Sequence, residues 1–144
     1  MKKSSAQVRN RLAVAPRLAV EKRVDPDGSL HLTVTGIEPP SRNRADKMHW
    51  SKRHELTKNI ELMLRSRGEL PAFKGPVSID YFRTSTSDLD EDNLAGSFKP
   101  IGDALVRIGV IEDDKPAIVA LTCRQGRRGG FGQRFTVSIA RREP

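Results

Sequence analysis

The first pattern along the chain is a pair of short segments in which apolar and polar residues alternate. These segments run over 17–24 and 29–37, and they flank the sequence Asp25-Pro26-Asp27-Gly28. Alternation with a period of two is typical of half-buried strands, and a turn with proline second and glycine fourth is favoured between them. The pattern therefore predicts a β-hairpin, which ends at Pro39-Pro40-Ser41.

A longer segment with helical spacing follows the hairpin. Its apolar residues recur three or four positions apart, at Leu56, Ile60, Met63 and Leu64. Asp46 is a residue type favoured at a helix N-cap, and Gly68 is typical of a helix end. We therefore expect a loop over 41–47, a helix from Asp46 to about residue 67, and an alternating strand over 76–82.

The next segment with helical spacing has an apolar side and a charged side. At about 100° per residue, one side carries Leu94, Phe98, Ile101, Leu105 and Ile108, and the opposite side carries Asp92, Lys99 and Asp103. Asp92 and Asn93 are its candidate N-caps, and Gly109 marks its end near residue 108. Pro100 would clash inside a continuous helix, so the helix either kinks there or begins near Ser97.

Two further strands, near 117–123 and 134–140, close the chain, and a loop rich in arginine and glycine joins them. The order of hairpin, helix, strand, helix and two strands is typical of an α+β fold. We predict a single domain over 17–144, with a mixed β-sheet and two main helices. A basic, flexible tail over 1–16 is expected to precede it.

The composition is that of one ordinary domain. The chain has 144 residues, enough for its own core, and Cys123 is the only cysteine, so no internal disulfide can form. A single cysteine is typical of a reducing compartment, and no apolar run approaches the roughly 18 residues of a membrane helix. We therefore expect a soluble, cytoplasmic protein with no membrane contact.

Charge is unevenly distributed along the chain. The whole carries 26 Lys and Arg against 18 Asp and Glu, but residues 88–114 hold eight acidic residues and only two basic ones. A divalent cation relieves the repulsion among clustered carboxylates, and Mg²⁺ prefers oxygen ligands. An acidic metal site within basic surface is expected of a metal-dependent nuclease, although a solvated acidic loop fits the composition equally well.

Two groups of aspartates are the candidate metal ligands. Asp88, Asp90 and Asp92 would share one side if the strand before them continues in extended form, because strand side chains alternate. Asp113 and Asp114 follow the second helix, and only one of two neighbours in an extended segment would face a metal ion.

Several motifs occur in an order that resembles one known family. They are Pro39-Pro40-Ser41 followed by Asn43, Asp90-Glu91-Asp92-Asn93, Lys99, Asp103-Ala104-Leu105, Gly109, Asp113-Asp114 and Ile118-Val119. Over roughly 37–119, this order resembles the RusA family of Holliday-junction resolvases.

The resemblance implies a RusA-like fold and a homodimeric endodeoxyribonuclease that acts on branched DNA. It would cut four-way junctions by paired symmetric hydrolysis, in DNA recombination and repair, with Mg²⁺ as cofactor and Mn²⁺ as a substitute. By position, Asp90, Asp92 and Asp114 would be the metal-binding catalytic carboxylates, and Lys99 the active-site lysine. Lys99 lies six residues after Asn93, a longer spacing than in the family's prototype, and the first 30 or so residues lie outside the resemblance.

Each site residue has an expected role in hydrolysis. Carboxylate-bound Mg²⁺ would lower the pKa of a water molecule, and Lys99 would contact the scissile phosphate. Asp88, Asp103 and Asp113 are expected to orient the metal ligands. Contacts to DNA phosphates are expected from Arg42, Arg44, Lys47, Lys52, Arg53, Arg83, Arg124, Arg127, Arg128 and Arg134. Taken singly, each of these is equally typical of a solvated surface.

Two other functions stay open at this point. Asp113-Asp114-Lys115 matches the D-x-K triplet of restriction-enzyme-like nucleases, in which Asp113 and Lys115 would act together with an upstream acid. A non-catalytic nucleic-acid-binding module would use the basic surface alone. Among the aromatic residues, Phe131 in the arginine- and glycine-rich loop is a candidate for stacking on a base, and Trp50 is expected to pack against the protein.

Overall fold

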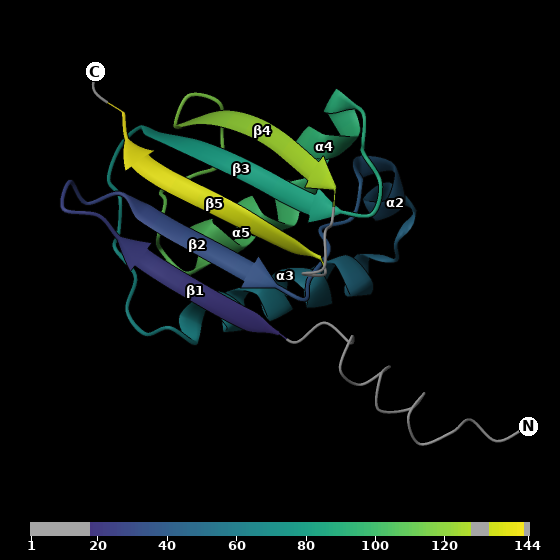
Figure 1. The fold of residues 1–144 in the computed structure, drawn as a ribbon, viewed down its shortest axis with the longest axis horizontal. Coiled ribbons are helices and arrows are strands. Elements are labelled where there is room, and N and C mark those ends of the chain that lie inside the picture. Colours follow the sequence, from purple (N-terminus) through teal and green to yellow (C-terminus); the bar gives the residue numbers. More distant parts are fainter. Residues whose placement is uncertain (1–17, 128–132, 143–144) are drawn as a thin grey trace, which may run out of the picture.

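Five strands form one mixed sheet in the computed structural model, which describes residues 18–127 and 133–142 (Figure 1). They are β1 (Ala19–Val24), β2 (Leu30–Thr35), β3 (Val77–Ser85), β4 (Val119–Arg127) and β5 (Arg134–Arg141). Their order across the sheet is β1-β2-β5-β3-β4. β3 and β4 pair in parallel and the other neighbours pair antiparallel, which confirms the predicted mixed sheet.

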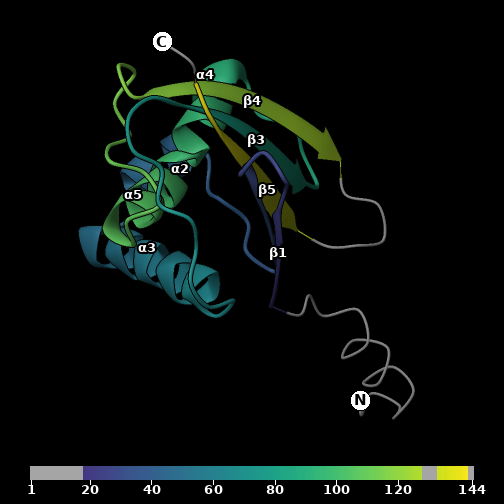
Figure 2. The ribbon, with the colours of Figure 1, turned by 90° about the vertical axis from the view of Figure 1, so that its left-hand side faces the viewer.

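Four helices cover one face of this sheet, and no helix of the described residues covers the other face (Figure 2). They are α2 (Arg42–Lys47), α3 (Trp50–Arg65), α4 (Glu91–Ser97) and α5 (Lys99–Arg107). α3 packs against α5, and α2 lies beside α4. Helices collected on one side of a largely antiparallel sheet confirm the predicted α+β class and the single domain.

The core lies between the sheet and the helices. Alternate residues of the central strands face it, namely Leu30, Leu32 and Val34 of β2, Val77, Ile79 and Tyr81 of β3, and Phe135, Val137 and Ile139 of β5. The register aligns them in rows, so that Val137 lies between Leu32 and Tyr81. The helices cover these rows with Ile60, Leu64, Ile101 and Leu105. Burial with a period of two is what the alternating pattern predicts.

β1 and β2 form the predicted hairpin. The backbone N–H of Gly28 donates to the carbonyl of Asp25 at 2.9 Å, and Gly28 has a φ of +92°, which glycine adopts without strain. His31 lies on β2, as expected of a strand residue, and its ring bonds to Ser138 and Asp25 at 2.8 and 2.7 Å. The turn is thereby tied to β5.

The prediction for the segment after the hairpin was partly wrong. Residues 42–47 form α2 rather than a loop, because the Ser41 hydroxyl caps it by accepting from the Arg44 N–H at 3.1 Å. Asp46 therefore lies inside α2 and caps nothing. α3 begins at Trp50 after a separate cap, in which the His49 ring accepts from the Ser51 N–H.

The predicted second helix is divided at Phe98. α4 ends at Ser97, and α5 begins at Lys99 with Pro100 in its first turn, where the missing proline N–H leaves no hydrogen bond unmade. Ser97 is not the cap of α5, because its hydroxyl donates to the Leu94 carbonyl at 2.6 Å. The apolar side is confirmed nonetheless: Leu94, Phe98, Ile101 and Leu105 are all buried.

No helix in the described part of the chain is both long and apolar enough to cross a membrane. The predicted tail over 1–16 lies outside the described residues, as do Arg128 and Phe131.

Candidate active site

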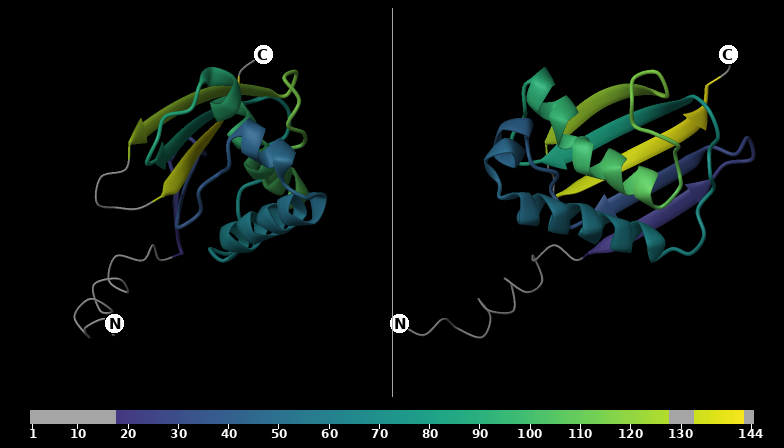
Figure 3. Two further views of the ribbon diagram at one scale, coloured as in Figure 1. Left: turned by 90° about the vertical axis from the view of Figure 1, so that its right-hand side faces the viewer. Right: turned by 180° about the vertical axis from the view of Figure 1, so that it is seen from behind.

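A cavity of about 960 Å³ lies between α2 and α3 on one side and α4, α5 and the start of β4 on the other. Figure 3 shows these helices side by side on their face of the sheet. Both acidic and basic side chains line the cavity, among them Asp92, Asp103, Asp114, Arg42, Arg53 and Lys99. The fold therefore brings three of the four predicted catalytic residues, Asp92, Lys99 and Asp114, to one place.

Lys99 is the centre of a small charged cluster in this cavity. Its Nζ lies 3.0 Å from Asp103 Oδ1 and 2.8 Å from Asp114 Oδ2. Lys99 and Asp103 are one helical turn apart on α5, so they share a face as the helical pattern predicts. Asp114 reaches the same ammonium from the segment after α5 and passes close to Gly102, where a Cβ atom would lie 3.5 Å from that of Asp114.

The cluster fixes the charges of its members. The hydrogen bond from Lys99 holds the pKa of Asp114 below its ordinary value. The hydrogen bonds to Asp114 and then Asp103 raise the pKa of Lys99. Both groups are therefore charged throughout the neutral pH range.

The contribution of this ion pair to the free energy of unfolding is expected to be small. It is expected to be lost at low pH, where Asp114 is protonated, and at high pH, where Lys99 is deprotonated. Because Lys99 is mostly exposed, we expect at most about 1 kcal/mol. Because the pKa of Asp114 is lowered, its contribution to the free energy of unfolding is present above the ordinary pKa of 3.8 and is lost as the pH falls below that value. Because the pKa of Lys99 is raised, its contribution to the free energy of unfolding is lost only above the ordinary pKa of 10.5.

Urea unfolding of the wild type and of Lys99→Met measures this contribution. The difference in the free energy of unfolding should be constant between about pH 5 and pH 9 and should vanish near about pH 2. A difference above about 2 kcal/mol at neutral pH would contradict this description of an exposed pair.

Asp90 caps α4 and is not among the described residues that line the cavity. Its carboxylate accepts from the backbone N–H of Asn93 at 2.9 Å and from Asn93 Nδ2 at 3.1 Å. The predicted caps, Asp92 and Asn93, were therefore wrong. The predicted alignment with Asp88 was also wrong, because β3 ends at Ser85 and Asp92 lies in the first turn of α4.

Asn93 also joins α4 to α2. Its Oδ1 accepts from the backbone N–H of Asn43 at 2.9 Å. Beside this contact, Gly96 lets the helices approach so closely that an added Cβ would lie 2.4 Å from that of Arg42. α2 and α4 are thereby fixed together, and Arg42 of α2 and Asp92 of α4 both line the cavity.

The remaining aspartates have different surroundings. Asp113 lies next to the cluster, where its Oδ1 accepts from the Asp114 N–H at 2.7 Å and its Oδ2 lies 3.5 Å from Lys115 Nζ. Asp113 can thus orient Asp114, the member of the pair that lines the cavity. Asp88 pairs with Arg127 at 3.8 Å near the end of β4 and does not join the cluster.

The cavity offers carboxylate oxygens, the ligand type that a hard divalent cation prefers. In 18–127 and 133–142, no group of three or more His, Cys, Asp or Glu side chains is arranged to hold a metal ion by itself. Mg²⁺, however, is commonly held by one or two carboxylates, with waters and substrate phosphates completing its shell. Of the three predicted metal ligands, Asp92 and Asp114 line the cavity and Asp90 does not, and the assignment of all three to a metal ion stays a prediction.

No protein-family model matches this chain, and no curated protein matches it either.

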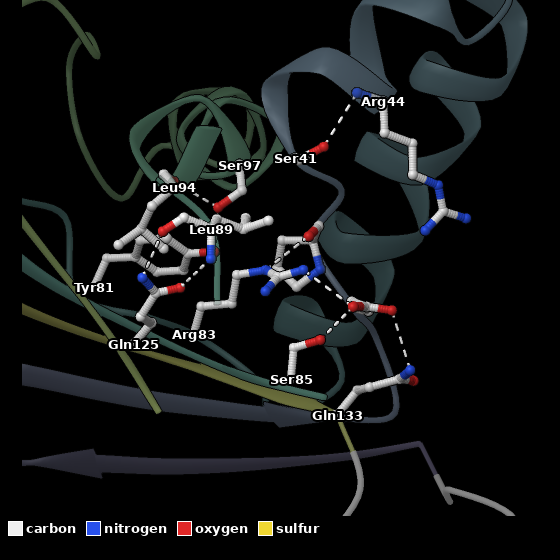
Figure 4. A network of polar contacts seen from close by, with 12 residues as sticks. Ser41, Arg44, Tyr81, Arg83, Ser85, Leu89, Leu94, Ser97, Gln125 and Gln133 are labelled. Carbon is white, nitrogen blue, oxygen red and sulfur yellow. Dashed lines mark hydrogen bonds and ion pairs between the residues drawn. The ribbon is translucent and has the colours of Figure 1, made fainter. Parts of the chain in front are cut away.

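Arg83 is not a phosphate contact, in contrast to the prediction. It is only 3% exposed, and it donates from Nε to the Pro39 carbonyl and from Nη2 to Glu38, both at 3.0 Å. Ser85 and Gln133 also donate to the Glu38 carboxylate (Figure 4). Arg83 instead anchors the segment that leads into α2.

Another pair of hydrogen bonds shown in Figure 4 positions the segment before Asp90. The Gln125 side chain accepts from the Leu89 N–H at 2.8 Å and donates to the Leu89 carbonyl at 2.7 Å. β4 thus holds the approach to α4 in place.

Six of the other predicted phosphate contacts lie in two regions, whereas Arg127 pairs with Asp88 and Arg134 begins β5. Arg42 and Arg53 line the cavity, and Arg44, Lys47 and Lys52 are exposed on α2 and α3 beside it. Arg124 is held by Asp80 at 3.0 Å and lies over the Phe82 ring, on the sheet face that the helices leave uncovered. The cations on α2 and α3 are therefore the ones that could guide DNA into the cavity.

Trp50 was expected to pack, and that expectation was wrong. It is the first residue of α3, is 67% exposed, and lines the cavity. Neither the spacing of apolar residues nor the cap signals could show this, because Trp50 precedes the first periodic residue of the helix.

Proposed function

We propose that this protein is a Mg²⁺-dependent endodeoxyribonuclease that resolves four-way DNA junctions by paired symmetric hydrolysis. The observation that supports it most is the meeting of Asp92, Lys99 and Asp114 in one cavity beside exposed cations. The order of the motifs, which resembles the RusA family, supports the choice of a junction as substrate. Mn²⁺ is the expected substitute for Mg²⁺.

Each of the cavity residues would have a different role in the hydrolysis. Asp92 and Asp114 would hold the metal ion, which supplies a water of lowered pKa and neutralises phosphate charge. Lys99 is held in place by Asp103 and Asp114, and its free donor can bond to a phosphate oxygen and stabilise the negative charge that develops there. Asp113 fixes the backbone of Asp114.

A homodimer follows from the proposed reaction. Each chain provides one set of Asp92, Lys99 and Asp114, whereas symmetric resolution needs two strands to be cut. Two copies related by a two-fold axis would present two cavities to the two strands.

The geometry favours this proposal over the two alternatives. Lys115 is exposed, is paired with Asp113, and is not among the described residues that line the cavity, which is unfavourable for a restriction-enzyme-like site. A binding module without a metal ion would place Asp92, Asp103 and Asp114 against DNA phosphates and would be repelled by them.

A cleavage assay on a synthetic four-way junction, a fork and a plain duplex tests the proposal. With Mg²⁺ or Mn²⁺ we expect paired nicks in two junction strands of like polarity and little cutting of the duplex. With EDTA we expect binding without cleavage. A junction that is bound but left uncut in every metal would contradict the proposal and favour a binding module.

Two variants distinguish the two nuclease mechanisms in the same assay. Lys99→Ala should abolish cleavage and Lys115→Ala should leave it. The reverse result would support the restriction-enzyme-like site.

A further inference from the structure

One wall of the cavity has no role in the proposed chemistry. It is formed by the first turns of α3, where Arg53 and His54 follow Trp50 by three and four residues and all three line the cavity. We call these three residues the α3 wall. Trp50 is the only tryptophan in the chain, and two thirds of it is exposed.

The side chains of the α3 wall make few polar contacts with the rest of the described protein, so they can contact a ligand. Among the described residues, no ion pair involves Arg53 or His54. The Trp50 ring lies beside the His49 ring, with the ring centres 5.4 Å apart and the planes tilted by 35°, and Trp50 is 67% exposed. A largely exposed indole, one helical turn from a guanidinium without an ion pair, is a combination that can bind a nucleobase and its phosphate.

The opposite side of the cavity carries the Lys99, Asp103 and Asp114 cluster. The cavity, at about 960 Å³, is as large as the pockets that hold whole small-molecule ligands. A strand whose phosphate lies at the cluster can therefore place an adjacent base on the α3 wall. In an intact duplex that base is stacked on its neighbours and cannot reach an indole, whereas bases at a branch point can be unstacked.

We propose that the α3 wall binds an unstacked nucleobase of the DNA strand, with the base on the face of Trp50 and its phosphate against Arg53. This subsite rests on the proposed function for its substrate, DNA. It would select branched or single-stranded DNA over duplex, a preference that the metal-binding carboxylates cannot provide by themselves.

Because Trp50 is the only tryptophan, its fluorescence reports on the subsite directly. The full-length protein, in EDTA to prevent cleavage, is titrated with single-stranded oligothymidylate, a four-way junction and a duplex, and binding is followed in parallel by anisotropy of labelled DNA. We expect quenching that saturates together with binding for the first two ligands, and duplex binding with little quenching.

Variants separate stacking from simple contact. Trp50→Leu should weaken binding of oligothymidylate about 5- to 100-fold, whereas Trp50→Phe keeps an aromatic face and should stay within a few-fold of wild type. Leu62→Ala is the matched control, because Leu62 is also on α3 and also 67% exposed but does not line the cavity. It should bind like wild type.

Three results would overturn the subsite. One is DNA binding, seen by anisotropy, without any change in Trp50 emission. Another is equal affinity of Trp50→Leu and wild type for oligothymidylate. The third is a shift of Trp50 emission with protein concentration in the absence of DNA, which would place Trp50 at a contact between two copies. Failure of the nuclease proposal is seen separately, as absence of Mg²⁺-dependent junction cleavage by the wild type.

Discussion

Replacing Asp114 with asparagine is expected to lower cleavage of a four-way junction at least about 100-fold while leaving junction binding intact. The Asp114 carboxylate lines the cavity and accepts a hydrogen bond from Lys99 at 2.8 Å, which lowers its pKa further below neutral pH, so it is charged there. Asparagine keeps the shape of the side chain but removes the charge that would hold a metal ion. Binding should persist because the change removes a negative charge, and so cannot weaken attraction to phosphates.

Glu112→Gln is the matched control for this prediction. Glu112 lies two residues away, is exposed, and does not line the cavity, and the change removes the same charge. It should cleave like wild type. Junction cleavage by Asp114→Asn within a few-fold of wild type would contradict the assignment of Asp114 to the reaction.

The same assay decides between two roles of Asp90. Asparagine is as good an N-cap as aspartate, so Asp90→Asn should leave α4 formed. Loss of cleavage in Asp90→Asn, as in Asp92→Asn, would then reflect a missing metal ligand, as the motif resemblance implies. Wild-type cleavage by Asp90→Asn would limit its role to capping α4.

Replacing Glu38 with alanine is expected to destabilise the fold by about 3 kcal/mol. Arg83 is buried, its Nη1 already has no hydrogen-bond partner among the described residues, and Glu38 is the one carboxylate paired with it there. Without Glu38 the guanidinium charge would be left uncompensated in the protein interior. Urea unfolding followed by circular dichroism measures the loss.

Two control variants are compared with Glu38→Ala. Glu21→Ala, on the exposed edge strand β1, should change the free energy of unfolding by no more than about 0.5 kcal/mol. Arg83→Met, which removes the buried charge itself, should cost less than Glu38→Ala and should leave DNA affinity unchanged. A cost below about 1 kcal/mol for Glu38→Ala, or weaker DNA binding by folded Arg83→Met, would contradict the structural role of Arg83.

Most of the strands could be predicted because their signal is local. Alternation over β2, β3 and β5 reports directly which side chains face the helices, and the buried side of α4 and α5 follows from helical spacing. α2 gave no such signal, because none of its six residues is buried. The only sequence signal for α2 is its N-cap residue, Ser41. Asp46 is also a residue type favoured at N-caps, but no helix begins directly after it.

The errors at the site have equally local causes. The strand that was expected to end at residue 82 continues to Ser85, so Arg83 follows Ile79 and Tyr81 onto the buried face. The aspartates after it were expected to remain extended, but α4 begins at Glu91 and takes Asp90 as its cap. The pairing of Lys99 with Asp103 could be predicted from their spacing. The approach of Asp114 depends on the path of the chain after α5, which no local pattern encodes.

The most direct test of a divalent ion in this cavity is anomalous X-ray diffraction from crystals of the full chain soaked in Mn²⁺. We expect a manganese peak between the carboxylates of Asp92 and Asp114, within coordination distance of both. A peak elsewhere, or none while Asp114 still binds Lys99, would contradict it.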